Sequence, residues 1–557
     1  MGSTKTTPRK PVADELERIQ QGVKVKELVR QSPLAYSVNG KEFGYETSLS
    51  APFTVGSYVT ISKEDGEEYL GQIITQDILV REGPEYAVAA AVDTRISPAF
   101  MPTSSTVKDR PRVRYIQGVG RLLGRVNEEG FTPTTDSDIF QEARISRAAD
   151  EAIAEYFSSI TRGHSALEVG KVLHSSGKAR VLLAASGFDR HTFLCGQSGS
   201  GKTFALGVIL EQILLETSLR IVIIDPNSDF IKLDELRPFE DVNKTRSTSL
   251  SDEQYQSITR RYDKVKPSLR IGRPKGHIEQ VSDCLRIRFS DLERHEQEAI
   301  LKLDPLNDRD ECFLFWQMIE PLVKQGHYSL EDVYKRIAGA SQTAGVEDIK
   351  KRISNLRIAD WGIWCPADGP SFIDELGGDW RCLIADIGML PPQQKSIIAM
   401  AILGYFWSNR EQKAPVLIVI DEAHNVCPQA PLSTFASMPT EHAIHIAGEG
   451  RKFGIYLLLA TQRPEKVHSN IMSQCDNLVL MRINSSKDLN YIAETFSQVP
   501  EPLLHQSSSF SQGEALLSGN ITSGVTFAKF EGRLAYEGGS DVPATWAVQG
   551  HLNESAS

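Results

Sequence analysis

The stretch GQSGSGKT, residues 196–203, decides what fold we expect of this 557-residue chain. It follows TFLCG, a short apolar run typical of a buried strand, and precedes FALGVILEQILLE, a strongly apolar helix. The glycines allow a tight curve whose backbone N–H groups can wrap a phosphate, and the helix points the positive end of its dipole at it. The pattern therefore predicts a phosphate-binding loop that ends a strand of a parallel sheet.

The residues of this loop divide the work by their chemistry. Lys202 is expected to reach the β- and γ-phosphates of a nucleotide, and Thr203 to place its hydroxyl on Mg²⁺. The other residues expected to hold the nucleotide, mainly through their backbone, are Gly196, Gln197, Ser198, Gly199, Ser200 and Gly201. The loop alone does not separate a switch, a small-molecule kinase and a motor.

A pair of acidic residues follows the apolar run VLIVI, residues 416–420. This run predicts a buried strand that ends in Asp421 and Glu422, at the edge where open parallel sheets bind ligands. Asp421 suits the Mg²⁺ shell, because a hard cation prefers carboxylate oxygen. Glu422 can orient and deprotonate an attacking water, so the pair favours hydrolysis. The alternative is that the two acids cap the next helix.

Two further strands complete the predicted core. CLIADIG, residues 382–388, supplies a buried strand between the phosphate loop and VLIVI, and IYLLLATQ, residues 455–462, ends in Thr461 and Gln462. A polar side chain such as Gln462 can sense the γ-phosphate, unless it only begins the turn before Pro464. An extra strand together with a catalytic glutamate is the arrangement of RecA-like P-loop ATPases. The predicted fold class is α/β with such a core.

Two arginines precede core strands. Arg190 lies in FDRHTFLCG, two residues before TFLCG, and Arg451 lies in EGRKFG, before IYLLLATQ. A guanidinium group is always charged and binds phosphate oxygens with two donors, so an exposed loop arginine can reach the phosphate of a neighbour as an arginine finger. A solvated or ion-paired surface arginine is the alternative at both positions.

Outside these motifs, the texture of the sequence predicts several regions. Residues 1–33 form a charged extension with a helix at 11–31, and residues 34–130 a small β-barrel with strands such as FTVGSYVTIS, YLGQIITQDIL and EYAVAAAVDT. Residues 131–165 are a linker with a helix from about Ala143 to Ile160. The ATPase core then occupies residues 166–239 and 379–557, split by a helical insertion at 240–378 and ending in short β segments.

Composition limits the partners. The net charge is −11, which does not support a broadly basic surface for nucleic acid. No run approaches the roughly 18 apolar residues of a membrane span, and the N-terminus lacks the apolar centre of a signal peptide, so we expect a cytoplasmic chain without a membrane partner. His191, His424 and His445 have no metal-ligand spacing and are interpreted as structural.

The series RHTFLCGQSGSGKT, IVIIDPNSDF, CLIADIG, VLIVIDEAH and EGRKFGIYLLLATQRP, in this order, resembles the HerA/FtsK superfamily of hexameric DNA-pumping ATPases. The resemblance implies a homo-hexameric ring, ATP and Mg²⁺ between neighbouring subunits, and double-stranded DNA in the central pore. It implies that Glu422 activates water, Gln462 is the sensor, and Arg451 acts on the ATP of the adjacent subunit. Arg190 would be a second phosphate-sensing arginine. Asp225 and Asp229 also match family positions, where helix capping is an equal alternative.

The chain departs from some members of the superfamily. It has no nuclease constellation and no winged-helix appendage that reads DNA sequence. The resemblance therefore implies a motor that works with a separate nuclease or a sirtuin-type effector, in DNA end processing or in anti-phage defence. The other hypothesis is a ring scaffold that binds ATP to hold its shape and activates a partner. Glu422 and Arg451 favour turnover, and a metabolite kinase is disfavoured by the barrel and the insertion.

Overall fold

The structure is a computed structural model with two compact units. It describes residues 33–47, 49, 53–81, 113–127, 130–133, 139–141, 143–274, 284–341, 343–431, 433–522 and 524–539. One unit holds the described residues up to Arg162 together with Val172–Ala179 and Pro500–Leu503, and the other holds the rest. The helix expected at 11–31 and the strand expected in EYAVAAAVDT lie outside the described residues.

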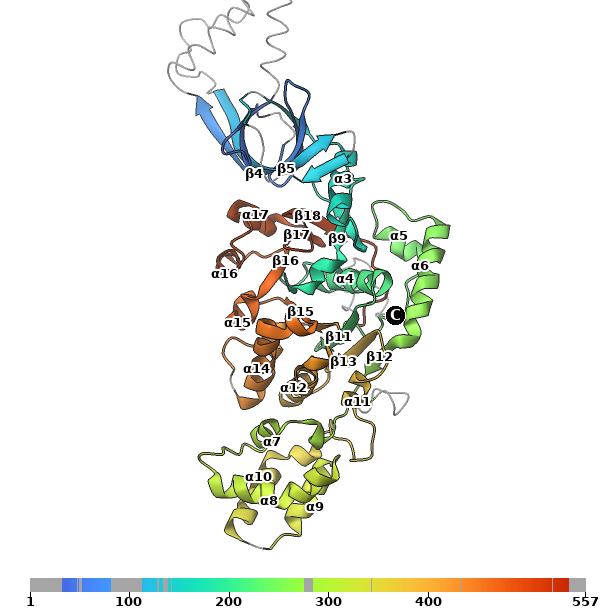
Figure 1. The fold of residues 1–557 in the computed structure, drawn as a ribbon, viewed down its shortest axis with the longest axis vertical. Coiled ribbons are helices and arrows are strands. Elements are labelled where there is room, and N and C mark those ends of the chain that lie inside the picture. Colours follow the sequence, from blue (N-terminus) through green and yellow to red (C-terminus); the bar gives the residue numbers. More distant parts are fainter. Residues whose placement is uncertain are drawn as a thin grey trace, which may run out of the picture. The chain divides into compact units, whose positions relative to one another are not determined.

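The first unit is built on a closed antiparallel barrel (Figure 1). Its strands follow one another around the ring in the order β2-β1-β7-β3-β4-β5, and β5 pairs back to β2. Large side chains such as Phe43, Tyr45 and Tyr69 fill the interior. The bounds of the strands are β1 (Leu34–Ser37), β2 (Glu42–Thr47), β3 (Tyr58–Ser62), β4 (Glu68–Arg81), β5 (Val113–Asn127) and β7 (Ala143–Arg147), with β6 (Gly130–Pro133) pairing to β5 outside the ring.

The predicted helix from Ala143 is wrong over its first residues. Ala143–Arg147 is strand β7, which pairs with β1 and β3, and helix α3 spans Asp150–Ile160. The reason is the period of the pattern, because Ala143 and Ile145 alternate with exposed residues and point into the barrel core. The barrel therefore extends beyond the expected boundary at residue 130.

The second unit contains one large mixed sheet, in the order β12-β13-β11-β14-β15-β10-β16-β17-β18-β8-β9. The pairs from β12 to β16 are parallel, whereas the β16–β17, β17–β18 and β8–β9 pairs are antiparallel. The bounds are β8 (Ala166–Val172), β9 (Arg180–Ala184), β10 (His191–Cys195), β11 (Arg220–Asp225), β12 (Leu269–Gly272), β13 (Cys382–Asp386), β14 (Val416–Ile420), β15 (Ile455–Thr461), β16 (Cys475–Met481), β17 (Glu514–Ser518) and β18 (Thr526–Phe530).

This sheet confirms the predicted α/β class with a parallel core. The strand between the phosphate-loop strand β10 and the acidic strand β14 is β15, and the CLIADIG strand β13 lies beyond β11. Sequence order cannot give this placement, because parallel strands are joined by crossovers that skip positions in the sheet. The main helices of the core are α4 (Lys202–Glu216), α12 (Pro392–Ser408) and α14 (Thr434–Glu449).

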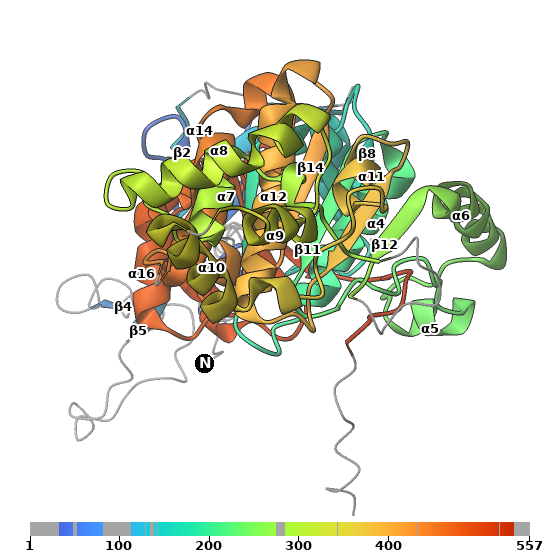
Figure 2. The same cartoon turned by 90° about the horizontal axis from the view of Figure 1, so that it is seen from below.

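The region expected as a helical insertion has two parts. The first holds α5 (Phe239–Lys244), α6 (Asp252–Val265) and β12, and β12 pairs in parallel with β13, so the purely helical interpretation is wrong here. The second part is the helical group α7 (Arg294–Ile300), α8 (Arg309–Gln325), α9 (Leu330–Ala338), α10 (Ala344–Leu356) and α11 (Phe372–Leu376). Figures 1 and 2 show α7–α10 gathered together, apart from α5 and α6, with α7 next to α14.

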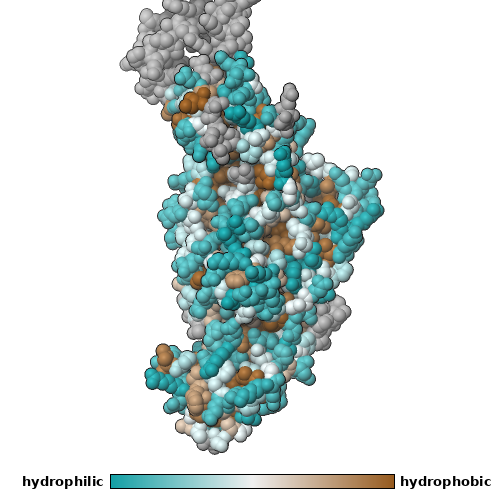
Figure 3. Space-filling model, viewed as in Figure 1, coloured by the Kyte–Doolittle hydropathy of each residue, from teal (hydrophilic) through white to brown (hydrophobic). Residues whose placement is uncertain are grey.

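The surface of the described residues is largely polar. On the face drawn in Figure 3 most residues are hydrophilic, and apolar side chains form small, separate spots. In the described part of the chain, no helix combines the length and the apolar character that a bilayer span requires.

Candidate nucleotide-binding and hydrolysis site

The loop 196–203 joins β10 to α4 at the carboxyl edge of the parallel strands. Gly199 and Gly201 have φ values of 73° and 93°, in the left-handed region that side chains disfavour. A Cβ on Gly196 would lie 2.7 Å from Cβ of Met481, so this position has no room for a side chain. The backbone curve that the sequence predicts is therefore present, and the glycines are what allow it.

Lys202 is buried against the acidic end of β14. Its side chain is 5% exposed and forms ion pairs with Asp421 and with Glu422, where Nζ lies 3.1 Å from Oε1. Burial by itself would lower the pKa of Lys202, but the two carboxylates outweigh burial and raise it. The structure thus brings together the lysine and both acids that the sequence singled out, and the lysine stays charged.

Glu422 is held from several sides. Its backbone has a φ of 44°, and its Oε1 accepts a hydrogen bond from Nε2 of Gln462 at 2.7 Å. Nδ1 of His424 lies 3.2 Å from its Oε2. Burial would raise the pKa of Glu422, but His424, Lys202 and Gln462 together lower it to about 2. The carboxylate is therefore ionised and oriented. Movement of Lys202 to a bound phosphate would remove one cause of the low pKa and make Glu422 a stronger base.

Oxygen atoms suited to a hard cation lie beside this cluster. Oδ2 of Asp421 is buried, and within the described residues it has no hydrogen-bond partner. The Thr203 hydroxyl donates to Oδ2 of Asp229 at 3.2 Å. Mg²⁺ prefers such carboxylate and hydroxyl oxygens, so the residues present fit the ion. They also include Asp229, whose role the sequence left open.

Burial shifts the pKa of Asp225, the last residue of β11, and that of Asp229 in the turn after it. It raises the pKa of Asp225 to about 7 and that of Asp229 to about 6, and the nearby charge of Asp421 adds to both shifts. Asp225 accepts hydrogen bonds from the backbone N–H groups of Asn227 and Phe230. Asp225 therefore shapes the turn after β11 and caps no helix, since the next helix, α5, begins at Phe239, whereas Asp229 faces Thr203.

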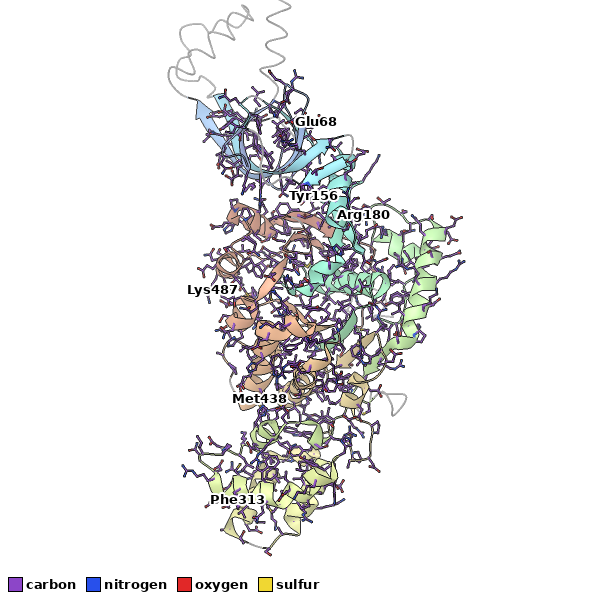
Figure 4. The ribbon with its side chains drawn as sticks, viewed as in Figure 1. Glu68, Tyr156, Arg180, Phe313, Met438 and Lys487 are labelled. Carbon is purple, nitrogen blue, oxygen red and sulfur yellow. The ribbon has the colours of Figure 1, made fainter. Side chains whose placement is uncertain are left out.

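A cleft of about 660 Å³ opens beside the loop, a size that fits a nucleotide. The loop and Gln462 form one wall, and residues that the sequence did not single out form the other: Lys171, 244–247, Gln512, Gly513 and 529–531. Glu531 is fixed there by Arg180, labelled in Figure 4, at 2.8 Å. These residues come from four distant segments, so no local pattern could have identified them.

Arg190 and Arg451 lie at the amino ends of the parallel strands, whereas the loop lies at their carboxyl ends. Arg190 precedes β10 and Arg451 lies in the short helix η7 (Gly450–Phe453) before β15. Both pair with Asp476 at the start of β16, at 3.4 Å from Arg190 Nε and 3.1 Å from Arg451 Nη1. Their side chains are 31% and 44% exposed. The structure brings the two arginines together but does not bring them to the loop of their own chain.

The structure adds residues that the motifs missed. His424, interpreted as structural, contacts Glu422 and the Thr461 hydroxyl, so it belongs to the site. Arg482, at the end of β16, donates to the carbonyl oxygen of Gly199 at 3.3 Å. His191 is buried and its ring nitrogens contact Ala447 O and Leu457 N, a structural position. One weak indication of the role of His424 was present in the sequence: it lies two residues after Glu422, and both follow strand β14.

The comparisons with known proteins agree with this geometry. A family model described as "Helicase HerA, central domain" matches residues 167–360. A DNA double-strand break repair helicase HerA of Sulfolobus acidocaldarius is 25% identical over 91% of this chain and 95% of its own length. The protein of that name from Sulfurisphaera tokodaii is 24% identical over 76% of this chain and 78% of its own length. Over most of its length the chain is thus similar to HerA helicases, and it is an ATPase. Its nucleotide is ATP.

Solved structures are more distant. VirB4 of Thermoanaerobacter pseudethanolicus is 15% identical, covers 66% of this chain and 96% of its own, and has a TM-score of 0.43. The bacterial conjugative coupling protein TrwB is 14% identical, covers 70% of this chain and 94% of its own, and has the same TM-score.

Proposed function

We propose that this ATPase is a ring-shaped motor of six subunits that hydrolyses ATP to move double-stranded DNA through its central pore. The sequence relatives named DNA double-strand break repair helicase HerA support the choice of DNA as the substrate. The ring form is supported by the separation of the arginines from the loop, because a finger that cannot serve its own chain can serve the next one.

One observation carries the hydrolytic part of the proposal: buried Lys202, Asp421 and Glu422 form a cluster with half-buried Gln462. In this cluster Lys202 and Thr203 hold the phosphates and Mg²⁺, with Asp421 as the acidic partner of the ion. Mg²⁺ would neutralise the charge of the phosphates when it is bound. Glu422 orients the attacking water and accepts its proton, and Gln462 reports the presence of the γ-phosphate to Glu422 through their hydrogen bond.

The arginines complete the site from the neighbouring subunit. Arg451 is the more exposed of the two and lies on a short helix, so it is the finger that stabilises charge in the transition state. Arg190 shares Asp476 with it and acts as a second phosphate-sensing arginine. Exchange of the exposed Asp476 contact for a phosphate costs little, because an exposed ion pair contributes at most about 1 kcal/mol.

The motor works with a separate protein, a nuclease or a sirtuin-type effector, in DNA end processing or anti-phage defence. This part of the proposal is supported by the family resemblance and by the lack of a nuclease constellation in the sequence. A ring scaffold that uses ATP only to hold its shape is the second candidate. The charged, fully assembled Lys202–Glu422 contact favours turnover over a purely structural nucleotide.

The test measures whether DNA stimulates ATP hydrolysis and whether the chain moves along DNA. The purified full chain should hydrolyse ATP faster with linear duplex DNA and should displace a third strand annealed to that duplex. Glu422→Gln should do neither while still binding ATP, and sedimentation should show six subunits. Hydrolysis that ignores DNA, together with an intact ATP-bound ring that displaces nothing, would instead establish the scaffold.

A further inference from the structure

A group of side chains of the kinds that bind metals lies away from the ATP site, where α7 contacts α14. His295 and Glu296 lie on α7, and His442 lies on α14. One ligand atom from each residue can be chosen so that all three lie within 4.8 Å of one another. Met438, one turn before His442, marks this border between α14 and the helical group in Figure 4.

Glu296 is held in place by its own helix. It is 2% exposed, and its Oε2 accepts a hydrogen bond from the backbone N–H of Glu293 at the start of α7, at 2.6 Å. Its other oxygen, Oε1, lies 2.8 Å from Nε2 of His442, which is also buried. One oxygen is thus fixed and the other is directed at an imidazole nitrogen. Metal-binding carboxylates are oriented by such additional hydrogen bonds.

Space for an ion is left by a glycine on a third helix, α12. A Cβ on Gly404 would lie 3.2 Å from Oε1 of Glu296 and 3.3 Å from Nε2 of His442. A cavity of about 280 Å³ adjoins this point and is lined by Glu293, Glu296, Gly404 and residues near them. Oε1 of Glu296 and Nε2 of His442 therefore face Gly404, where no side chain fills the space.

His295 provides the third ligand from the solvent side. Its side chain is 56% exposed, and its ring centre lies 6.3 Å from that of His442. Zinc–nitrogen bonds are about 2.0–2.1 Å long, so ligands of one ion lie about 3.3 Å apart. Because the His295 ring is exposed, rotation about its side-chain bonds can bring a ring nitrogen closer to the other two ligand atoms. Glu293 lies 3.4 Å from its Nδ1 and is available as a fourth ligand.

We propose that His295, Glu296 and His442 bind a divalent transition metal of the zinc class, with Glu293 or water in the fourth position. Two imidazoles and one carboxylate suit such an ion, whereas Mg²⁺ favours an all-oxygen shell. The ion fastens the helical group to α14. Because α14 runs directly into η7, which carries Arg451, the ion also stiffens the helix that positions this arginine.

The test uses the full chain after dialysis against a chelator, without nucleotide or Mg²⁺. Calorimetric titration with Zn²⁺ should show one site, and Co²⁺ should give the visible absorption bands of tetrahedral coordination. His295→Ala changes an exposed side chain and should weaken Zn²⁺ binding at least about tenfold and abolish those bands. His445→Ala is the matched control, since His445 is an exposed histidine on α14, the helix of His442, and stacks on Trp407.

A second measurement covers the buried ligands. His442→Ala and Glu296→Gln should remove the rise in melting temperature that Zn²⁺ gives to the unmodified chain, as should His295→Ala, because only the folded chain gathers these ligands. The proposal is overturned if the unmodified chain takes up no Zn²⁺, or if it and His295→Ala bind Zn²⁺ with equal affinity.

Discussion

The two edges of the parallel sheet carry charged residues in opposite settings. At the carboxyl edge, Lys202, Asp421 and Glu422 are buried and in contact. At the amino edge, Arg190 and Arg451 share an aspartate that is itself half-exposed. Removing one partner from a buried pair is costly, whereas an exposed pair can change partners easily. The first edge thus holds a buried cluster with fixed partners, and the second holds exposed charges that can change partners.

Lys202→Ala, which removes the cation of the buried cluster, should have the largest effect on ATP binding and hydrolysis. Without the ammonium group the phosphates lose their cation, and Asp421 and Glu422 repel each other and the nucleotide, so ATP binding and hydrolysis should both become undetectable. Fluorescent-nucleotide titration and phosphate release measure this. Unfolding should be followed in parallel, since loss of one buried partner costs about 3–5 kcal/mol. A folded variant with normal nucleotide affinity would contradict the role of Lys202.

Arg451→Ala should give the next largest effect, from the exposed edge. If Arg451 is the finger proposed above, hydrolysis should fall about 10³-fold while ATP affinity stays nearly unchanged. Lys452→Ala, the exposed neighbouring residue, is the control. Mixed rings of Arg451→Ala and Lys202→Ala subunits should regain activity, because one subunit supplies the loop and the other the arginine. Hydrolysis at the unmodified rate, or no recovery in mixed rings, would break the comparison.

Glu422→Gln should leave binding intact and slow hydrolysis at least about 10²-fold, because the amide is similar in shape but cannot accept a proton. Single-turnover hydrolysis and nucleotide titration separate the two effects. Glu441→Gln, on the exposed side of α14, is the control. Normal turnover by the Glu422 variant would show that another group activates water.

Asp229→Asn should produce the smallest effect, on stability against pH. The folded pKa of Asp229 is raised from the usual 3.8 to about 6, so the folded chain keeps a proton that the unfolded chain loses. Its stabilising contribution is therefore complete below about pH 4 and is lost as the pH rises to about 6.

In nucleotide-free protein without Mg²⁺, the melting temperature of the unmodified chain should thus fall by about 1–3 °C more than that of Asp229→Asn between pH 4.5 and 7. Asp263→Asn, exposed on α6, should follow the unmodified chain. Parallel curves for the unmodified chain and Asp229→Asn would mean that Asp229 keeps its ordinary pKa.

Much of the fixed edge was predictable because its signals are local. The loop consists of the eight consecutive residues from Gly196 to Thr203, in which Gly199 and Gly201 adopt the positive φ angles that the turn needs. Asp421 and Glu422 directly follow a buried apolar run. Strands that alternate apolar and polar residues, and strands that are wholly apolar, could also be predicted, because each pattern lies within a few consecutive residues. The pattern failed at Ala143–Arg147 and at β12, where short segments join a sheet through distant partners.

The sequence by itself determined the α/β class, the phosphate loop and the acidic pair, since each depends on neighbours in the chain. Only the tertiary structure decided that β15 separates β10 from β14, that His424 and Gln462 hold Glu422, and that Asp476 unites the two arginines. It also brought α7, α12 and α14 together around His442. Contacts between residues hundreds of positions apart depend on strand order and helix packing, which no short pattern encodes.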